Sequence, residues 1–288
     1  MAIKVILAPL YGVPADEAAL AAALTAARRF SAHIDVIHVR PDPRTMIPYI
    51  GEGMSGVLIE EMIASAEQQA EERAVKVRKA YDRWRKTANL PEDGGAVGNP
   101  SCTWVETVDR PDTAIARRGR LADLIVVCRP DGANAVTTVT EGLEAALLES
   151  GRPLLVAPAK PRKAIGAHIA IAWNGGAEAS RAVAASLPFL PAAETVSIIT
   201  IGEARAPEVD GDALAAYLVR HGVQAQVRRI EPASGLSVGR QLLAAAEADD
   251  ADLMVMGAYT HSRLRELVFG GVTREVLSAA NLPVVMAH

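Results

Sequence analysis

The sequence predicts an α/β fold of two tandem doubly wound domains, each a five-stranded parallel sheet with helices on both faces. Three observations support this prediction. Strand patterns alternate with helical ones, several strands are apolar at every position, and the whole series of elements occurs twice in 288 residues. We place the domains at residues 1–158 and 165–288. Between them lies the linker 158–163, where two prolines and three cations disfavour both helix and strand.

The two halves correspond strand by strand. In the first half we expect strands at 5–9, 34–39, 104–108, 122–127 and 152–156. Their counterparts are 169–173, 196–201, 225–230, 251–256 and 282–286. The fourth pair, Ala122–Val127 and Ala251–Met256, is the most alike. Parallel strands joined through helices require crossover connections, for which we expect the usual right hand.

A long helix separates the second and third strands of the first half. Its apolar residues recur every three or four positions, which predicts one face of a helix of about 30 residues and about 45 Å. They are Ile59, Met62, Ile63, Ala66, Ala70, Ala74, Val77, Tyr81 and Trp84. The other face carries charged residues such as Glu60, Glu67 and Arg78. We interpret it as a solvated face over a packed one, with a surface for a partner as the alternative.

Composition and charge narrow the class of protein. The formal net charge is −4, which gives no general argument for binding nucleic acid or a membrane surface. Cys102 and Cys128 lie far apart in the sequence, so we do not expect a disulfide framework. We therefore expect the protein to occupy a reducing compartment. We see no signal peptide and no apolar run of the roughly 18–20 residues that span a bilayer. The expected location is the cytoplasm.

One stretch matches the motif of a catalytic serine. Residues Gly235–Gly239 spell GxSxG, the pattern of a hydrolase nucleophile, with Asp249, Asp252, His261 and His288 further along the chain. A true nucleophile turn follows its strand directly, whereas here the strand ends at Ile230. Capping of the next helix by Ser237 explains the same residues without chemistry. The histidines show no metal-ligand spacing.

The closing stretch of the chain carries the clearest sign of a binding site. The strand at 251–256 stops at Gly257, and Gly270-Gly271 opens the next helix. The first N–H groups of a helix lack partners within it and lie at the positive end of its dipole. Glycines let a ligand approach the backbone closely. This pattern predicts a site for a phosphate or another anion.

In this stretch the chain resembles the universal stress protein family. Nucleotide-binding members carry the signature G-x2-G-x9-G-[ST]. It is matched here by Gly257, by Thr260 in the place of the second Gly, by Gly270, and by Gly271 in the place of Ser or Thr. The run 264–273 and the ending 282–285 also fit. The resemblance covers both halves and implies a tandem member with a Rossmann-like, adenine nucleotide alpha hydrolase-like fold.

The resemblance also implies a ligand and its site. Family members that bind ATP place adenine near the end of the first strand, where an acidic residue usually stands, whereas this chain has Asn174. The expected ligand is ATP, or AMP or ADP, with Mg²⁺ as a companion of ATP. The expected site residues are Ala172, Asn174, Ile201, Met256, Gly257, Thr260, His261, Gly270, Gly271, Val272 and Thr273.

By the same comparison the first half has lost its site. Cys128 stands in the place of Gly257, Thr140 and Glu141 in those of Gly270 and Gly271, and Leu10 in that of Asn174. Since a carboxylate repels phosphate, we expect this half to be structural. Family dimers often pair through their last strands, and the apolar strands 154–156 and 284–286 suit such pairing within this chain, as a pseudo-dimer. A homodimer of chains is also expected.

The leading functional prediction is a non-enzymatic stress-response protein that binds an adenine nucleotide in its C-terminal half. The alternative is a dimeric scaffold or interaction module that binds no nucleotide. A weak ATPase and a Ser237 hydrolase are the remaining enzymatic readings.

Overall fold

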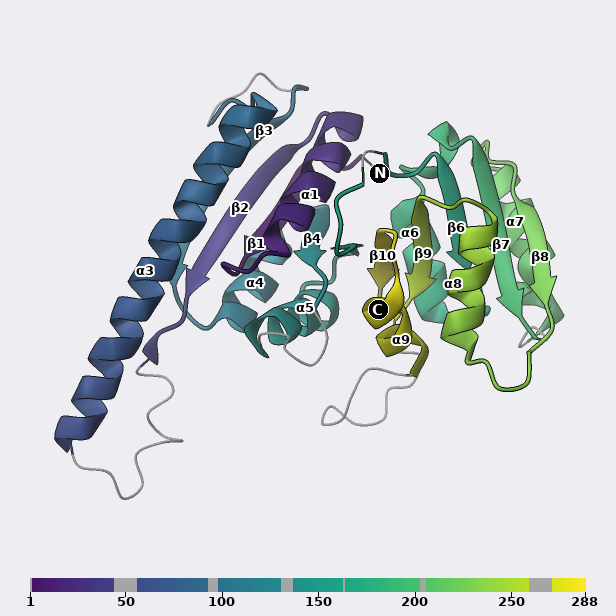
Figure 1. The fold of residues 1–288 in the computed structure, drawn as a ribbon. Coiled ribbons are helices and arrows are strands. Elements are labelled where there is room, and N and C mark those ends of the chain that lie inside the picture. Colours follow the sequence, from purple (N-terminus) through teal and green to yellow (C-terminus); the bar gives the residue numbers. More distant parts are fainter. Residues whose placement is uncertain are drawn as a thin grey trace.

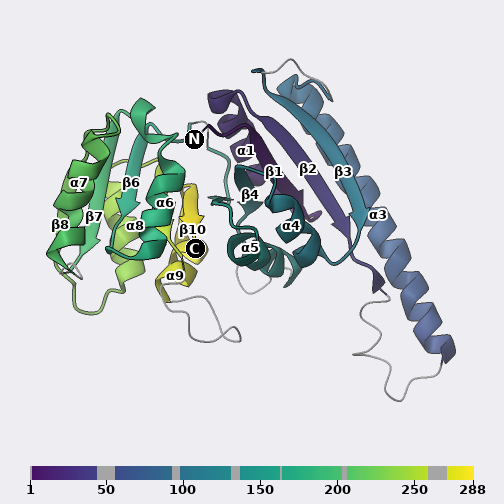
Figure 2. The same cartoon turned by 180° about the vertical axis from the view of Figure 1, so that it is seen from behind.

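Ten strands form one continuous sheet with helices on both faces (Figures 1 and 2). The computed structural model describes residues 2–43, 56–92, 98–130, 137–162, 164–202, 206–258 and 271–288. The strand order is β3-β2-β1-β4-β5-β10-β9-β6-β7-β8, and all pairs within each half are parallel. The predicted fold class, two tandem doubly wound units, is confirmed.

The element bounds follow the predicted order. The first-half strands are β1 (Val5–Leu10), β2 (His33–Arg40), β3 (Ser101–Val108), β4 (Leu124–Cys128) and β5 (Leu154–Ala157). The second-half strands are β6 (His168–Ala172), β7 (Thr195–Ile201), β8 (Gln226–Ile230), β9 (Leu253–Gly257) and β10 (Val284–Ala287). The α-helices are α1 (Asp16–Phe30), α3 (Gly56–Ala88), α4 (Pro111–Gly119), α5 (Thr137–Glu149), α6 (Ala177–Ser186), α7 (Gly211–Val219), α8 (Val238–Ala248) and α9 (Gly271–Ala279). Two short 3₁₀ helices, η3 (Leu190–Ala192) and η4 (Pro207–Val209), lie in the second half.

The two halves join through their last strands. β5 and β10 pair antiparallel, with Leu155 opposite Val285, and both side chains are fully buried. Every residue of these two strands is buried. The prediction that the halves pair through residues 154–156 and 284–286 is therefore confirmed.

The closest sequence match between the halves has a structural explanation. The Asp123 carboxylate accepts the backbone N–H groups of Lys4 and Val5, just where β1 begins. Its counterpart Asp252 accepts those of Gly166, Ala167 and His168 before β6. Each aspartate satisfies backbone donors that no strand partner reaches. The aspartate recurs in both halves because the backbone donors at the start of β1 and of β6 need the same acceptor.

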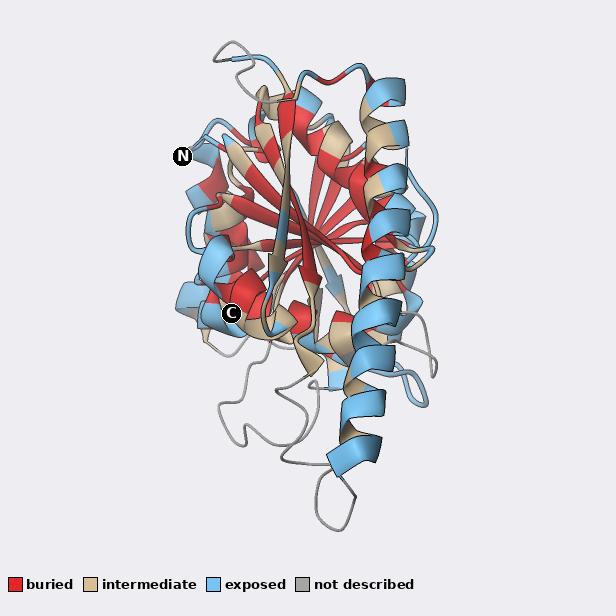
Figure 3. Ribbon diagram, turned by 90° about the vertical axis from the view of Figure 1, so that its left-hand side faces the viewer, coloured by how far each residue is buried: buried red, intermediate tan, exposed pale blue. Residues whose placement is uncertain are grey.

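The long helix α3 packs over only part of its length. Its buried residues are Ala74, Val77, Tyr81 and Ala88, whereas none from 56 to 73 is buried. Figures 1 and 3 show this part of the helix projecting past the sheet. The prediction of a packed face from Ile59 to Trp84 is correct from Ala74 onward and wrong before it, because the sheet beneath the helix ends there.

Among the described residues, no helix is both long and apolar enough to cross a membrane.

Candidate functional site

The candidate site lies at the carboxyl edge of the second-half sheet. β6 lies between β7 and β9, so the connections that leave β6 and β9 run to opposite sides of it. Ligands of open α/β sheets bind in the crevice that such a reversal of strand order leaves. Ala172 at the end of β6 is level with Met256 in β9, and both are buried. These two predicted site residues therefore lie side by side at the base of the crevice.

The turn after β6 is held in a fixed shape. Gly175 adopts a φ of +70°, which a side chain would strain. The Asn174 side-chain Oδ1 accepts the Gly176 N–H at 2.8 Å, just before α6 begins. The Trp173 indole donates to the Val209 carbonyl at 2.8 Å and so joins this turn to η4. Asn174 remains exposed at the sheet edge.

Ile201 flanks this turn on the side of β7. β7 pairs with β6 up to Ile199, opposite Ala172, and continues two residues further to Ile201. Ile201 is half-buried. It therefore supplies an apolar surface beside the crevice, at the position where we predicted that Ile201 would flank the adenine base.

Gly257 has a packing role that the sequence did not reveal. A Cβ at this position would come within 2.7 Å of the Glu178 carbonyl carbon and 2.8 Å of the Glu178 Cβ. The first turn of α6 thus packs directly on the end of β9. Glycine is required here for the approach of a helix, whatever its role toward a ligand.

Glu178 is a site residue that sequence reasoning missed. It lies in the first turn of α6, between Gly176 and Gly257. Its Oε2 atom is buried and finds no hydrogen-bond donor among the described residues. A buried carboxylate oxygen without a donor is costly, and a ligand at this edge would stabilise it only if the Glu178 side chain turned outward. Its distance of four residues from the expected acidic position hid it from a motif search.

The N-terminus of α9 forms another part of the site. Gly271 is the first helical residue and is exposed, and a Cβ built on it meets no atom within 4 Å among the described residues. Val272 is half-buried and Thr273 is buried. The hydroxyl group of Thr273 is therefore less accessible than its position suggests, and backbone N–H groups are what this end of the helix offers. The predicted site residues Thr260, His261 and Gly270 lie outside the described residues.

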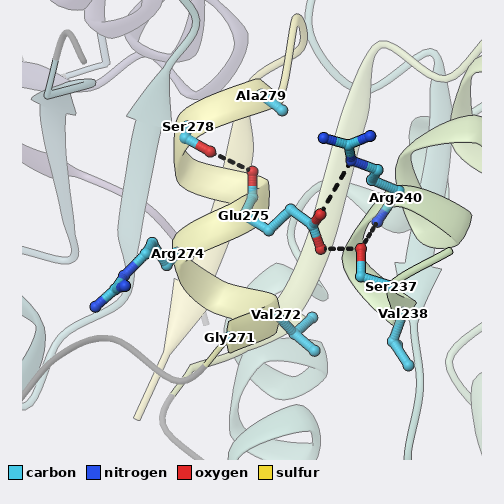
Figure 4. Close-up of a pocket in the computed structure, with 9 residues that line it drawn as sticks. All are labelled: Ser237, Val238, Arg240, Gly271, Val272, Arg274, Glu275, Ser278 and Ala279. Atoms are coloured by element: carbon cyan, nitrogen blue, oxygen red, sulfur yellow. Dashed lines mark hydrogen bonds and ion pairs between the residues drawn. The ribbon is translucent and has the colours of Figure 1, made fainter. Parts of the chain in front are cut away.

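A groove between α8 and α9 adjoins this helix end (Figure 4). Its volume is about 520 Å³, and it is lined by Ser237, Val238, Arg240, Gly271, Val272, Arg274, Glu275, Ser278 and Ala279. Glu275 reaches across it to accept the Ser237 hydroxyl and to pair with Arg240 at 3.3 Å. Figure 4 shows the three side chains pointing toward one another.

Ser237 is the N-cap of α8, as predicted. Its hydroxyl oxygen accepts the Arg240 N–H, and it donates to Glu275. Two of the partners considered for a hydrolase lie elsewhere, because Asp252 binds the backbone before β6 and Asp249 pairs with Arg228. Gly239 is needed because a Cβ there would approach the Glu275 side chain within 3.1 Å. Capping and packing thus account for the GxSxG residues.

The equivalent edge of the first half is filled by Tyr11. Ile6 pairs with Leu124, and Ile169 pairs with Leu253, the counterpart of Leu124. Ile6 is therefore equivalent to Ile169, so Leu10 is equivalent to Trp173 and Tyr11 to Asn174. The predicted match of Leu10 with Asn174 is therefore wrong by one residue. Tyr11 is buried, and its ring lies against Gly142 in α5, where a Cβ would come within 3.1 Å of the tyrosine Cζ. The space that is open at Asn174 is closed here by a side chain.

Asp16 fixes the backbone beneath Tyr11. Its carboxylate accepts the N–H groups of Tyr11, Gly12 and Val13, the shortest at 2.7 Å from Gly12. Burial raises the pKa of Asp16 to about 6, against the lowering effect of these three donors. Burial and the nearby Asp16 also raise the pKa of the Cys128 thiol. When ionised, the Asp16 carboxylate would oppose an anionic ligand at this edge by like charge, and the neutral Cys128 thiol would not offset it.

Comparisons with known proteins agree with this architecture. The sequence model of the Universal stress protein family matches residues 203–288. Residues 203–288 therefore carry the sequence pattern of this family's domain. The search of curated proteins found no match. The matched residues include β8, β9, α9 and β10, and with them Gly257 and Gly271.

Solved structures extend the similarity to both halves. A universal stress protein from Archaeoglobus fulgidus DSM 4304 superposes with a TM-score of 0.69 at 14% identity, over 98% of this chain and 97% of that one. A putative universal stress protein from Pseudomonas aeruginosa UCBPP-PA14 gives 0.57 at 15% identity, over 99% and 93%. A protein of unknown function from Pseudomonas aeruginosa PAO1 gives 0.59 at 15% identity, over 99% and 92%. At these identities the likeness is one of fold.

Proposed function

We propose that this chain is a universal stress protein that binds one adenine nucleotide, at the carboxyl edge of its second half, without strong catalysis. The observation that carries the proposal is the contrast between equivalent positions. Asn174 and Gly271 are exposed at this edge, whereas Tyr11 is buried across the corresponding edge of the first half. One half has an accessible edge and the other has a filled one.

The accessible edge offers the groups that a nucleotide needs. The α9 N-terminus would receive the phosphates through the backbone N–H groups of Gly271, Val272 and Thr273. The base would lie against Ala172, Ile201 and Met256, an apolar surface next to the polar Asn174. With its Oδ1 bound to Gly176, Asn174 would turn its Nδ2 donor to the ligand. Glu178 would accept a hydrogen bond from an amino or hydroxyl group.

ATP is the proposed ligand, with AMP and ADP as alternatives, and Mg²⁺ would accompany the triphosphate. Thr260, His261 and Gly270 remain part of the proposed site. We expect slow or absent turnover, because no motif in the sequence supplies a strong base or a metal site for hydrolysis. Release of ADP over hours, measured at saturating ATP, checks this expectation.

Calorimetric titration of nucleotide-stripped protein with ATP and Mg²⁺ tests the proposal. We expect one site per chain and a loss of binding of at least about tenfold in Gly271→Glu, through charge repulsion at the helix end. Gly271→Gln is the matched control, because it adds the same bulk without charge in the open space around Gly271. Absence of heat at millimolar ATP would overturn the proposal, as would equal losses in both variants.

A second candidate function is a dimeric scaffold or interaction module, which the exposed part of α3 favours. We propose the cytoplasm as its location, since two cysteines that lie far apart in the sequence, Cys102 and Cys128, give no disulfide framework. Neither proposed function involves nucleic acid or a membrane. A homodimer of chains is part of this second proposal.

A further inference from the structure

The first part of α3 has an exposed surface that the fold does not explain. Val57 and Met62 are exposed at 68% and 42%. The helix leaves the body of the first half at Arg73, whose side chain packs against Gly12 after β1. Residues 56–72 thus extend beyond it for about 25 Å, at 1.5 Å per residue. We call this part the α3 tip and residues 73–88 the α3 base.

Charges are sorted along this helix. The tip contains five glutamates and no cation, whereas the base contains seven lysines and arginines and one aspartate. In the base, Arg78 and Arg85 pair locally with Asp82 and Glu92. The exposed acids of the tip include Glu60, Glu61, Glu71 and Glu72, and the exposed cations of the base include Lys76, Lys79, Arg83 and Lys86.

The helix dipole does not account for this order. Acids at the start of a helix and cations at its end are favourable, but the effect is confined to the first and last turns. Glu71, Glu72 and Lys76 stand in the middle of the 33-residue helix. The change of sign falls between Glu72 and Arg73, where the helix also leaves the protein body. Two independent features therefore mark the same point.

We propose that the tip of α3 binds the base of α3 in a second copy of this chain. In an antiparallel pair with its two-fold axis near Glu72 and Val75, each acidic tip would lie on the partner's basic half. A parallel pair would set acid against acid. Val57 and Met62 would pack on the aliphatic stems of partner lysines and arginines, and Val75, 49% exposed, would lie near the axis. Figure 3 shows the outer face of α3 exposed along its length.

The small size of the contact indicates a weak complex. A helix of 33 residues offers a strip about 50 Å long and about 10 Å wide, or roughly 500 Å² per partner. The total of roughly 1,000 Å² is at the low end for specific complexes. We therefore expect a reversible dimer with a Kd on the order of micromolar, weakened by salt because its charges are exposed.

Charge reversal with complementation tests the proposal. The tip variant carries Glu60, Glu61, Glu71 and Glu72→Lys, and the base variant carries Lys76, Lys79, Arg83 and Lys86→Glu. All eight residues are exposed, so both variants should fold, which thermal unfolding checks. Sedimentation velocity across protein concentrations should show a dimer for the wild type and at least about tenfold weaker self-association for each variant.

Mixing the two variants is the decisive measurement. Both the tip and the base of α3 then carry a net positive charge in one variant and a net negative charge in the other. An equimolar mixture should form a heterodimer at least as stable as the wild-type dimer. A second-half variant with Glu194, Glu208, Glu231 and Glu247→Lys, all exposed, adds the same positive charge as the tip variant. It is the control for net charge and should dimerise like the wild type. A wild type that stays monomeric at about 100 times the expected Kd, variants that dimerise normally, or a mixture that stays monomeric would each overturn the proposal.

Discussion

Replacement of Asp16 by asparagine should change how stability depends on pH. Burial raises the pKa of Asp16 from 3.8 to about 6 in the folded protein. The folded state therefore holds this proton more tightly than the unfolded chain does. The stabilising contribution of Asp16 is full below about pH 4 and is lost as pH rises through about 6. A difference of about two pKa units corresponds to about 3 kcal/mol.

Urea unfolding of the wild type and Asp16→Asn between pH 4 and pH 7 measures this effect. The free energy of unfolding of the wild type, relative to the variant, should fall by about 2–2.5 kcal/mol over that range, most of the full effect. Carboxyl NMR on the folded protein would read the Asp16 pKa directly. The difference between the two proteins also includes a constant part, because an amide cannot accept all three N–H groups, but this part does not vary with pH.

Asp112→Asn is a control of opposite sign. A hydrogen bond from Arg110 lowers the pKa of Asp112. Its stabilising contribution is therefore present above the unfolded pKa and is lost only as pH falls through the lower folded value. Between pH 5 and 7 the Asp112→Asn difference should be flat. If the Asp16 difference is equally flat, burial does not raise its pKa and the reasoning fails.

Four further changes test single features of the structure. Gly257→Ala should lower the free energy of unfolding by about 1–3 kcal/mol, because its Cβ would overlap the α6 backbone; an unchanged urea midpoint would contradict this packing. Tyr11→Phe should raise that free energy by about 1 kcal/mol, since the Tyr11 hydroxyl is buried without a partner among the described residues. Gly271→Ser should tighten ATP binding by about 2–10-fold through a hydroxyl donor in open space, and calorimetry would show whether the site can use it. Ser237→Ala should cost about 1 kcal/mol of stability as a lost helix cap, while hydrolysis of an ester substrate stays at the wild-type level.

The strands were predictable because buried parallel strands are apolar at every position. Leu253–Met256 and Leu124–Val127 needed no other information than their pattern and its repetition. Pairing of β5 with β10 followed from their apolar character together with the family resemblance. Helical periodicity, in contrast, shows which face of α3 is apolar but not what covers it. Met62 and Tyr81 lie in the same pattern, yet Tyr81 is fully buried and Met62 is exposed.

At the candidate site, the kinds of residue present were easier to predict than the contacts that each residue makes. Ala172 and Met256 do lie together, because adjacent parallel strands end at the same edge. The shift from Leu10 to Tyr11 was hidden because the apolar pattern of a buried strand does not fix its register to one residue. The burial of Asp16 and the orphan oxygen of Glu178 depend on contacts between distant elements. Local sequence holds no record of such contacts.

The antiparallel pairing of β5 with β10 also protects the protein from aggregation. If the halves separated, each would present a fully apolar strand, such as Leu154–Ala157, with its backbone donors and acceptors unpaired. Joined, these two strands lie at the centre of the sheet, and the sheet ends instead at β3 and β8, which carry charged residues such as Glu106 and Arg229. Because the two halves belong to one chain, these apolar strand edges stay paired at any protein concentration. A chain organised in this way never needs to find a second molecule to cover them.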